Sequence, residues 1–153
     1  NIYIKSKVFC EKLLISSLEK KIFDKLIILR LPAIVGKNSN ENFIKKTILN
    51  MKHDKPINIW NKSVKFNNLI HINDLNNLIL HSISKKSNKK KILIDCLSSQ
   101  SIKIMQLMFF LKKKLNSRSK INFVNGTKFK KIENNFIKNY KFFTVKKAVS
   151  LLI

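Results

Sequence analysis

The sequence is poor in the residues that most sharply constrain a chain. Its 153 residues include two glycines, two prolines and two cysteines. A loop that cradles a dinucleotide pyrophosphate needs several closely spaced glycines, so no such loop can lie in this sequence. The cysteines, Cys10 and Cys96, form no motif, and three scattered histidines add no metal-ligand pattern. The sequence therefore predicts no disulfide framework and no metal site, and free thiols fit a cytoplasmic protein.

Arginine and acidic residues are scarce beside lysine. The chain carries 32 Lys and Arg against eight Asp and Glu, a formal charge of +24, and its only arginines are Arg30 and Arg118. Such a charge attracts polyanions without regard to sequence. Specific nucleic-acid recognition, however, favours Arg for its bidentate contacts. Lys, Ile and Asn together supply 72 residues, and all three have A/T-rich codons. We therefore expect no specific nucleic-acid partner, although a basic nucleic-acid-binding module stays open as an alternative.

Long hydrophobic runs are also missing. No apolar run reaches the roughly 18 residues that a membrane span requires, and nothing at the N-terminus is typical of a signal peptide. No membrane association is predicted. Hydrophobic residues still make up 44% of the chain, which is enough for a packed core.

The hydrophobic pattern alternates between two periods. Periodic segments predict helices at residues 3–19, 42–51, 74–83, 102–115 and 144–152. Short apolar runs predict strands at residues 26–31, 57–60, 69–72, 92–95 and 121–124, the last ending at Gly126, with a polar connection at 85–91. Pro32 should end the first strand, and Asn42 and Asp74 should cap the helices that follow them. Trp60 and the phenylalanines are expected in the core. This alternation is typical of an α/β architecture.

Tyr3 and Lys7 form the first candidate catalytic pair. Residues four apart lie on one face of a helix. A positive charge beside a phenol favours the phenolate, which allows a tyrosine to act as a general acid or base near neutral pH. Lys occupies roughly one position in five, so the pair alone could also be two unrelated residues on a half-exposed helix.

Four motifs in order give the pair a context. They are Tyr3-x-x-Ser6-Lys7-x-x-x-Glu11, the segment LRLPAIVG at 29–36, Asn42-Phe43 at a helix start, and FNNLIHINDL at 66–75. In order and spacing they closely resemble the C-terminal half of extended short-chain dehydrogenases/reductases, the NAD-dependent epimerase/dehydratase family. The closing segment, 145–152, is similar to that family's last helix.

The resemblance implies a fold. It implies the C-terminal part of a Rossmann-like doubly wound parallel sheet with a small α/β substrate domain, the N-terminal dinucleotide-binding half being missing. Residues 1–153 would form one incomplete domain. Residues 1–36 and 67–96 would supply the back half of the Rossmann-like core, and residues 37–66 and 97–153 the substrate-binding subdomain.

The resemblance also implies a function. The intact enzyme would use NAD or NADP to epimerise, dehydrate or reduce a nucleotide sugar, as a step towards surface polysaccharide, and would be a homodimer. The fragment alone is expected to be inactive and to bind cofactor poorly. A non-catalytic relative of the family is the second alternative.

Roles for individual residues follow from the resemblance. Tyr3 would be the catalytic acid/base, and Lys7 would lower the pKa of Tyr3 and bind the nicotinamide ribose; both would touch the cofactor. The backbone at Pro32, Ala33 and Ile34 would face the nicotinamide, because ligands of open α/β sheets bind at the carboxyl ends of the strands. The implied substrate-binding residues are Asn42, Phe43 and Asn67.

Other residues have structural interpretations, and two depart from the family. Ser6 fits a preference for a small residue, and Glu11 is expected to pair with a neighbouring Lys. His71 should lie at a strand end. Related epimerases carry Asn at the position of Ala33 and Arg at that of Asn67, and Asn cannot reproduce the fork that Arg makes with a phosphate. Holding the substrate's diphosphate would then need other residues, such as a Lys.

Overall fold

The computed structural model describes residues 1–84, 88–124 and 140–153. Within them the chain is α/β, as predicted. The helices are α1 (Ile2–Glu19), α2 (Phe43–Lys52), α3 (Ile72–Ser84), α4 (Ile104–Lys114) and α5 (Val145–Ser150). The strands are β1 (Leu26–Arg30), β2 (Ala33–Val35), β3 (Ile57–Trp60), β4 (Lys65–Phe66), β5 (Leu69–His71), β6 (Lys91–Asp95), β7 (Ile102–Lys103) and β8 (Ile121–Val124).

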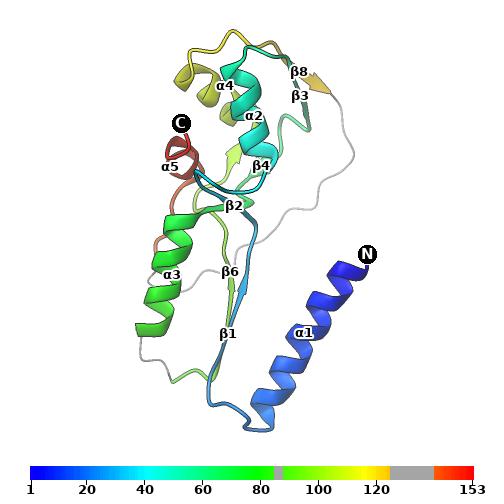
Figure 1. The fold of residues 1–153 in the computed structure, drawn as a ribbon, viewed down its shortest axis with the longest axis vertical. Helices are drawn as coiled ribbons and strands as arrows, with labels where there is room; N and C mark the ends of the chain where they lie inside the picture. The colour runs from blue at the N-terminus through cyan, green and yellow to red at the C-terminus, as the bar shows by residue number, and fades with distance from the viewer. Residues whose placement is uncertain (85–87, 125–139) are drawn as a thin grey trace.

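The long strands β1 and β6 form the axis of one half of the molecule. They pair in parallel, with Leu26 opposite Lys91 and Arg30 opposite Asp95. Helices α1 and α3 lie on opposite sides of this pair (Figure 1). Alternate residues of a strand point to the same face. The face towards α3 is apolar because it carries Ile27 and Leu29 of β1 and their β6 partners Ile92 and Ile94.

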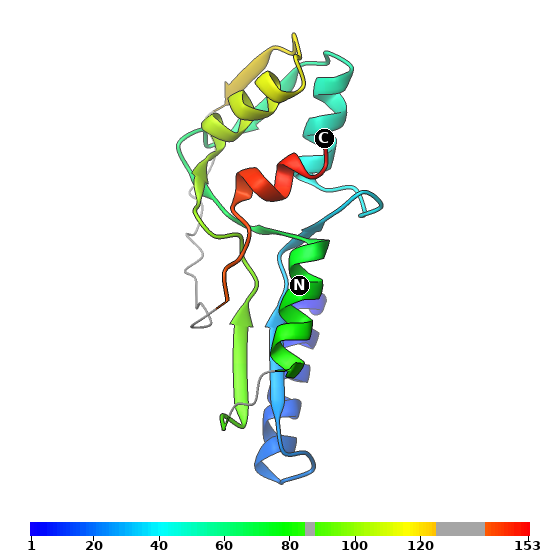
Figure 2. The same cartoon turned by 90° about the vertical axis from the view of Figure 1, so that its left-hand side faces the viewer.

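Three further pairs build the other half. β2 pairs with β5 and β3 with β8, both in parallel, and β4 pairs with β7 in the antiparallel sense. Helices α2, α4 and α5 gather at this end, beyond the tips of β1 and β6 (Figure 2). Gly36 allows the end of β2 to approach the start of α3, since a Cβ there would lie 2.9 Å from Cγ2 of Ile72.

The buried side chains form two clusters. The larger one lies among α2, α4, α5 and β3, and it is centred on Met51, Ile59, Leu107, Met108 and Leu111. The smaller one lies between α3 and the β1–β6 pair; its buried members are Ile70, Leu75, Leu78, Ile94, Cys96 and Phe142. The division of the chain into a core and a substrate subdomain stays a prediction.

The predicted elements are present, with shifted boundaries and three added strands. The helix expected from residue 102 begins at Ile104, because Ile102 and Lys103 pair with β4. The strand expected to reach residue 72 ends at His71, where α3 begins. The prediction that β1 ends before Pro32 is confirmed, but β2 starts immediately after it. The expected strand end at Gly126 lies outside the described residues, as does part of the 85–91 connection.

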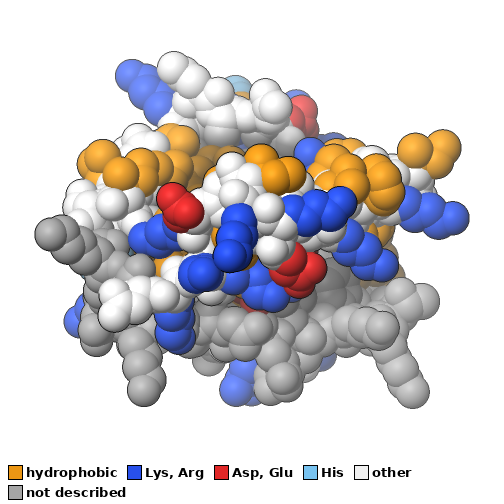
Figure 3. Space-filling view, turned by 90° about the horizontal axis from the view of Figure 1, so that it is seen from below, with side chains coloured by type: hydrophobic (Ala, Val, Ile, Leu, Met, Phe, Trp, Pro, Cys, Tyr) orange, Lys and Arg blue, Asp and Glu red, His pale blue; other side chains and the backbone are white. Residues whose placement is uncertain are grey.

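Several apolar side chains expected inside are exposed. Trp60 is 57% exposed, which makes its assignment to the core wrong, and Phe9, Phe43 and Phe109 are also exposed. Helix α1 carries the largest group: Ile2, Ile4, Val8, Phe9, Leu13 and Leu14. Seen from below, exposed apolar side chains lie among scattered lysines (Figure 3).

Candidate active site

The first two turns of α1 carry the predicted catalytic pair. Asn1 caps the helix, its side-chain oxygen accepting a hydrogen bond from the Tyr3 backbone N–H at 3.0 Å. The Lys7 Nζ lies 5.4 Å from the centre of the Tyr3 ring, within the range of a cation–π contact. The Ser6 hydroxyl donates to the Tyr3 carbonyl at 2.8 Å. Tyr3 is 66% exposed, so its hydroxyl is open to a reacting partner.

The segment predicted to face the nicotinamide lies at the carboxyl end of β1. Pro32 separates β1 from β2, and Ala33 and Ile34 begin β2. Ala33 is exposed, while Pro32 and Ile34 are half-buried. The N-terminal end of α1 lies level with the carboxyl ends of β1 and β6 in both views (Figures 1 and 2). The pair and the segment therefore occupy the same end of this strand pair, with Tyr3 and Lys7 on the side of α1.

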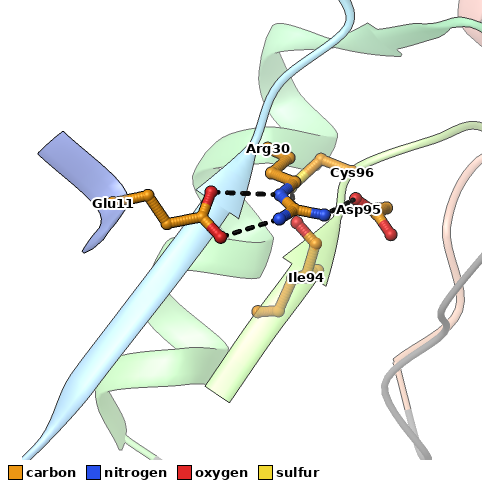
Figure 4. A network of polar contacts seen from close by, with 5 residues as sticks. All are labelled: Glu11, Arg30, Ile94, Asp95 and Cys96. Carbon is orange, nitrogen blue, oxygen red and sulfur yellow. Dashed lines mark hydrogen bonds and ion pairs between the residues drawn. The ribbon is translucent and has the colours of Figure 1, made fainter. Parts of the chain in front are cut away.

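An ion-pair network ties α1 to both strands. The Glu11 carboxylate accepts two hydrogen bonds from Arg30, from Nη2 at 2.7 Å and from Nε at 3.3 Å. The other terminal nitrogen of Arg30, Nη1, lies 3.8 Å from Asp95 Oδ1 (Figure 4). The hydrogen bonding of Arg30 to the Glu11 carboxylate, which accepts, is the main reason that the pKa of Arg30 is raised. Glu11 was expected to pair with a Lys; its partner is Arg30 instead.

Of the three predicted substrate-binding residues, Asn42 and Phe43 lie at the start of α2 and Asn67 lies between β4 and β5. Asn42 is the N-cap of α2, as its structural interpretation predicted: its side-chain oxygen accepts from the N–H groups of Ile44 and Lys45, both at 3.1 Å. Phe43 is 44% exposed and meets Phe66 edge to face. Asn67 is buried, and its carbonyl accepts from Leu69 and Ser98.

The cap expected at Asp74 is supplied by His71 instead. His71 ends β5 as predicted, and its Nδ1 accepts the Asn73 N–H at 3.1 Å, so His71 caps α3. Asp74 lies within the helix and is not its cap. Its carboxylate, 1% exposed, accepts from the Tyr140 hydroxyl at 2.8 Å and from the Phe143 N–H at 2.7 Å. Burial lowers the pKa of His71 against the opposing effect of Asp74.

Other possible sites are few in the described part of the chain. A cavity of about 360 Å³ is lined by Gln100, Ser101, Ile102, Gln106, Thr144 and Lys146. Among the described residues no three His, Cys, Asp or Glu side chains group as metal ligands would. None of the described helices is both long and apolar enough to cross a membrane.

Comparison with known proteins decides the family. A model of the NAD dependent epimerase/dehydratase family matches residues 1–94, the part that holds the Tyr–Lys pair, the β1–β2 segment and the His71–Asp74 segment. The chain belongs to the NAD dependent epimerase/dehydratase family. No curated protein matches the chain.

Solved structures show the same fold. The chain resembles dTDP-glucose 4,6-dehydratase from Bacillus anthracis in complex with NAD, with a TM-score of 0.77, 13% identity, and 98% of this chain covering 50% of that one. For UDP-glucose 4-epimerase from Thermotoga maritima with UDP-glucose, the TM-score is 0.73 and the identity 11%, with 94% of this chain covering 50% of that one. For RMD from Pseudomonas aeruginosa complexed with NADPH, the TM-score is 0.75 and the identity 16%, with 99% of this chain covering 55% of that one. The chain thus has part of this Rossmann-like α/β fold and spans about half the length of these structures.

Proposed function

We propose that this chain is the half of an NAD(P)-dependent nucleotide-sugar enzyme that supplies its acid/base pair and part of its sugar-nucleotide site. The observation that carries the proposal is the exposed Tyr3–Lys7 pair on successive turns of α1, level with the carboxyl ends of β1 and β6 (Figure 1). In open α/β sheets, ligands bind at that edge. The reaction is an epimerisation, dehydration or reduction.

Tyr3 is the group that moves the proton. Its Oη takes a proton from a sugar hydroxyl, or returns one to the carbonyl formed there, on the side of the site that α1 bounds. The positive charge of Lys7, held beside the ring, stabilises the phenolate that this transfer requires. The cofactor, when bound, supplies the acceptor or donor of the hydride.

The residues present fit the nicotinamide end of the cofactor. Ala33 has a small exposed side chain, and Pro32 and Ile34 add apolar surface beside it, so that a flat ring could approach the backbone. Lys7 could donate hydrogen bonds to a ribose hydroxyl. With two glycines in the chain, the pyrophosphate cradle must come from elsewhere. Two of the similar structures contain NAD and NADPH, respectively.

The sugar nucleotide would lie against the start of α2, which carries Asn42 and Phe43, and against Asn67 between β4 and β5. Phe43 offers an exposed ring, and Asn42 has its amide nitrogen 3.3 Å from the Asn40 carbonyl at the exposed surface. UDP-glucose is bound to the similar epimerase, and dTDP-glucose is named for the similar dehydratase. A homodimer is part of the proposal, and the exposed apolar side chains of α1 offer a surface for it.

The proposal is tested by conversion of nucleotide sugars. The chain would be combined with a dinucleotide-binding half, encoded upstream or supplied as a second polypeptide, and incubated with UDP- and dTDP-sugars and NAD or NADP. We expect a changed sugar in chromatography for at least one substrate, dependent on the cofactor. Conversion that continues when Lys7 is changed to Met, but stops in the control Lys5→Met, would contradict the assigned roles.

A further inference from the structure

The N-terminal half of α1 is held to the rest of the molecule at one end. Residues 2–10 are all exposed, whereas Glu11, Ile15 and Leu18 are half-buried, and Glu11 contacts Arg30 of β1. These three residues are spaced by four and three positions, so they form one stripe of the helix. Tyr3 and Lys7 lie beyond the outermost of these contacts.

We propose that Glu11, Arg30 and Asp95 form a positioning unit that sets the angle of α1 and thereby aims Tyr3 and Lys7 at the carboxyl edge of β1. This inference rests on the proposed function for its catalytic consequence. These three residues touch neither substrate nor cofactor in the proposal, and they act through the pair.

Arg30 is suited to this task because it is fixed from two directions. It is the last residue of β1, directly opposite Asp95, the last residue of β6. Its carbonyl accepts the N–H of Cys96, the residue after β6, at 3.0 Å, and Asp95 Oδ1 lies 3.8 Å from the guanidinium, so both its backbone and its side chain have partners at this end of β6. Leu29 packs towards α3, and alternation along the strand then directs Arg30 to the face of α1.

The contact with Glu11 is directional. Two parallel N–H···O bonds between a guanidinium and a carboxylate fix orientation as well as distance, which one ammonium group cannot do. The side chains of Glu11 and Asp95 are 22% and 16% exposed, whereas the Arg30 side chain is 51% exposed, so water is partly excluded from the carboxylates but reaches the guanidinium. The Glu11–Arg30 pair therefore constrains the direction of the helix axis.

The lever arm makes this constraint matter for the chemistry. Eight residues separate Glu11 from Tyr3, a distance of about 12 Å along a helix. A tilt of about 10° at Glu11 would move Tyr3 by about 2 Å, and a misplacement of about 1 Å can lower a rate about 100-fold. Lys7, halfway along the lever, would move by about half as much, so the two would also shift relative to the substrate.

Spin-label distances on the chain itself test the geometry. The labels would be attached in a Cys10→Ser background at Lys5→Cys on α1 and Asn77→Cys on α3, two exposed positions. Cys96 is buried with a pKa raised to about 11, so its thiol does not compete for label at neutral pH. We expect one narrow distance distribution between the two labels. Its width should increase at least twofold when Glu11→Gln or Arg30→Lys is added. Glu19→Gln, which removes an exposed charge from the same helix, should leave the distribution narrow.

The outcomes separate this inference from the proposed function. A narrow, unshifted distribution in both Glu11→Gln and Arg30→Lys, or a broad one before any change, overturns the positioning unit whatever the activity. In the assembled enzyme, Glu11→Gln should lower kcat at least 10-fold with KM for the nucleotide sugar changed less than twofold, and Arg30→Lys should retain part of the rate. A broadened distribution with unchanged kcat would also overturn it. An assembled enzyme without any turnover would instead contradict the proposed function and leave the distance result to decide the geometry.

Discussion

At the scale of single residues, Asn42 carries a structural and a proposed substrate-binding role together. Its side-chain oxygen serves two backbone N–H groups of α2, which leaves the amide nitrogen as the group that could meet a substrate. Asn42→Ala should lower the free energy of unfolding by about 1 kcal/mol through loss of the cap. Asn42→Asp keeps the capping oxygen and removes the donor.

The two variants of Asn42 separate its roles. Urea unfolding should find Asn42→Asp within about 0.5 kcal/mol of the original chain, and nucleotide-sugar KM in the assembled enzyme should rise in both variants. An unchanged KM in Asn42→Asp would remove Asn42 from the substrate site and leave it a helix cap only.

His71 makes the stability of the chain depend on pH. Its neutral ring caps α3 through Nδ1, and burial lowers its folded-state pKa below the usual value near 6.5. The unfolded chain therefore takes up the proton more readily than the folded one. The stabilising contribution is complete above about pH 6.5 and is lost as the pH falls through the folded-state pKa.

Melting temperatures between pH 7.5 and 4.5 check this dependence. The decline below about pH 6.5 should be smaller in His71→Asn, in which a non-titrating side chain keeps a capping oxygen. His53→Gln, at an exposed position, should decline like the original chain. Parallel curves for all three proteins would show that another group causes the loss.

The residue scale is also where sequence and structure differ most. Tyr3, Lys7 and Asn42 could be singled out because their spacing and position relative to helix starts are local properties. The Glu11–Arg30 and Asp74–Tyr140 contacts join positions 19 and 66 residues apart, which no local pattern records. The rarity of Arg in a Lys-rich chain was the one signal that could have marked Arg30.

At the scale of elements, the segment 140–144 is hydrogen-bonded both to α3 and to the residues that follow β6. Asp74 accepts from Tyr140 and Phe143, and the Ser99 hydroxyl donates to the Phe142 carbonyl at 2.7 Å. Asp74→Asn leaves one buried bond poorly made, because the amide nitrogen cannot accept. We expect a loss of about 1–3 kcal/mol.

Tyr140→Phe is the matched control for Asp74→Asn, since it removes one donor and leaves the carboxylate its second partner. Chemical denaturation should rank it between the original chain and Asp74→Asn, with a loss of about 0.5–1.5 kcal/mol. If Asp74→Asn is as stable as the original chain, the carboxylate does not hold this segment.

The long elements were predictable and the short ones were not. Helix α2 has a clear helical period, and strand β6 is a short apolar run between polar residues, so pattern, run length and flanking residues predict their types. β4 and β7 are two residues each and exist only because the two segments meet. The exposed apolar face of α1 has the pattern of a covered helix, and no periodicity reveals whether a partner is present.

At the scale of the whole molecule, the chain has the fold of about half the length of each similar structure, and it carries a formal charge of +24. Without a phosphate cradle it should bind NAD(P)H weakly and lose that binding as salt is raised above about 0.15 M, since only diffuse charge attracts the dinucleotide. Fluorescence titration of NADH into the 153-residue chain measures this directly. Tight, stoichiometric, salt-resistant binding would contradict it.

The central claim is that Tyr3 transfers the proton in an NAD(P)-dependent reaction of a nucleotide sugar. Its most direct test is the turnover number of the assembled enzyme with Tyr3→Phe, with Ser6→Ala as the control on the same turn. Because Tyr3 is exposed, the change should leave stability within about 0.5 kcal/mol and lower kcat about 100-fold or more. A Tyr3→Phe enzyme that turns over at the original rate would show that this family member does not use Tyr3 as its acid/base.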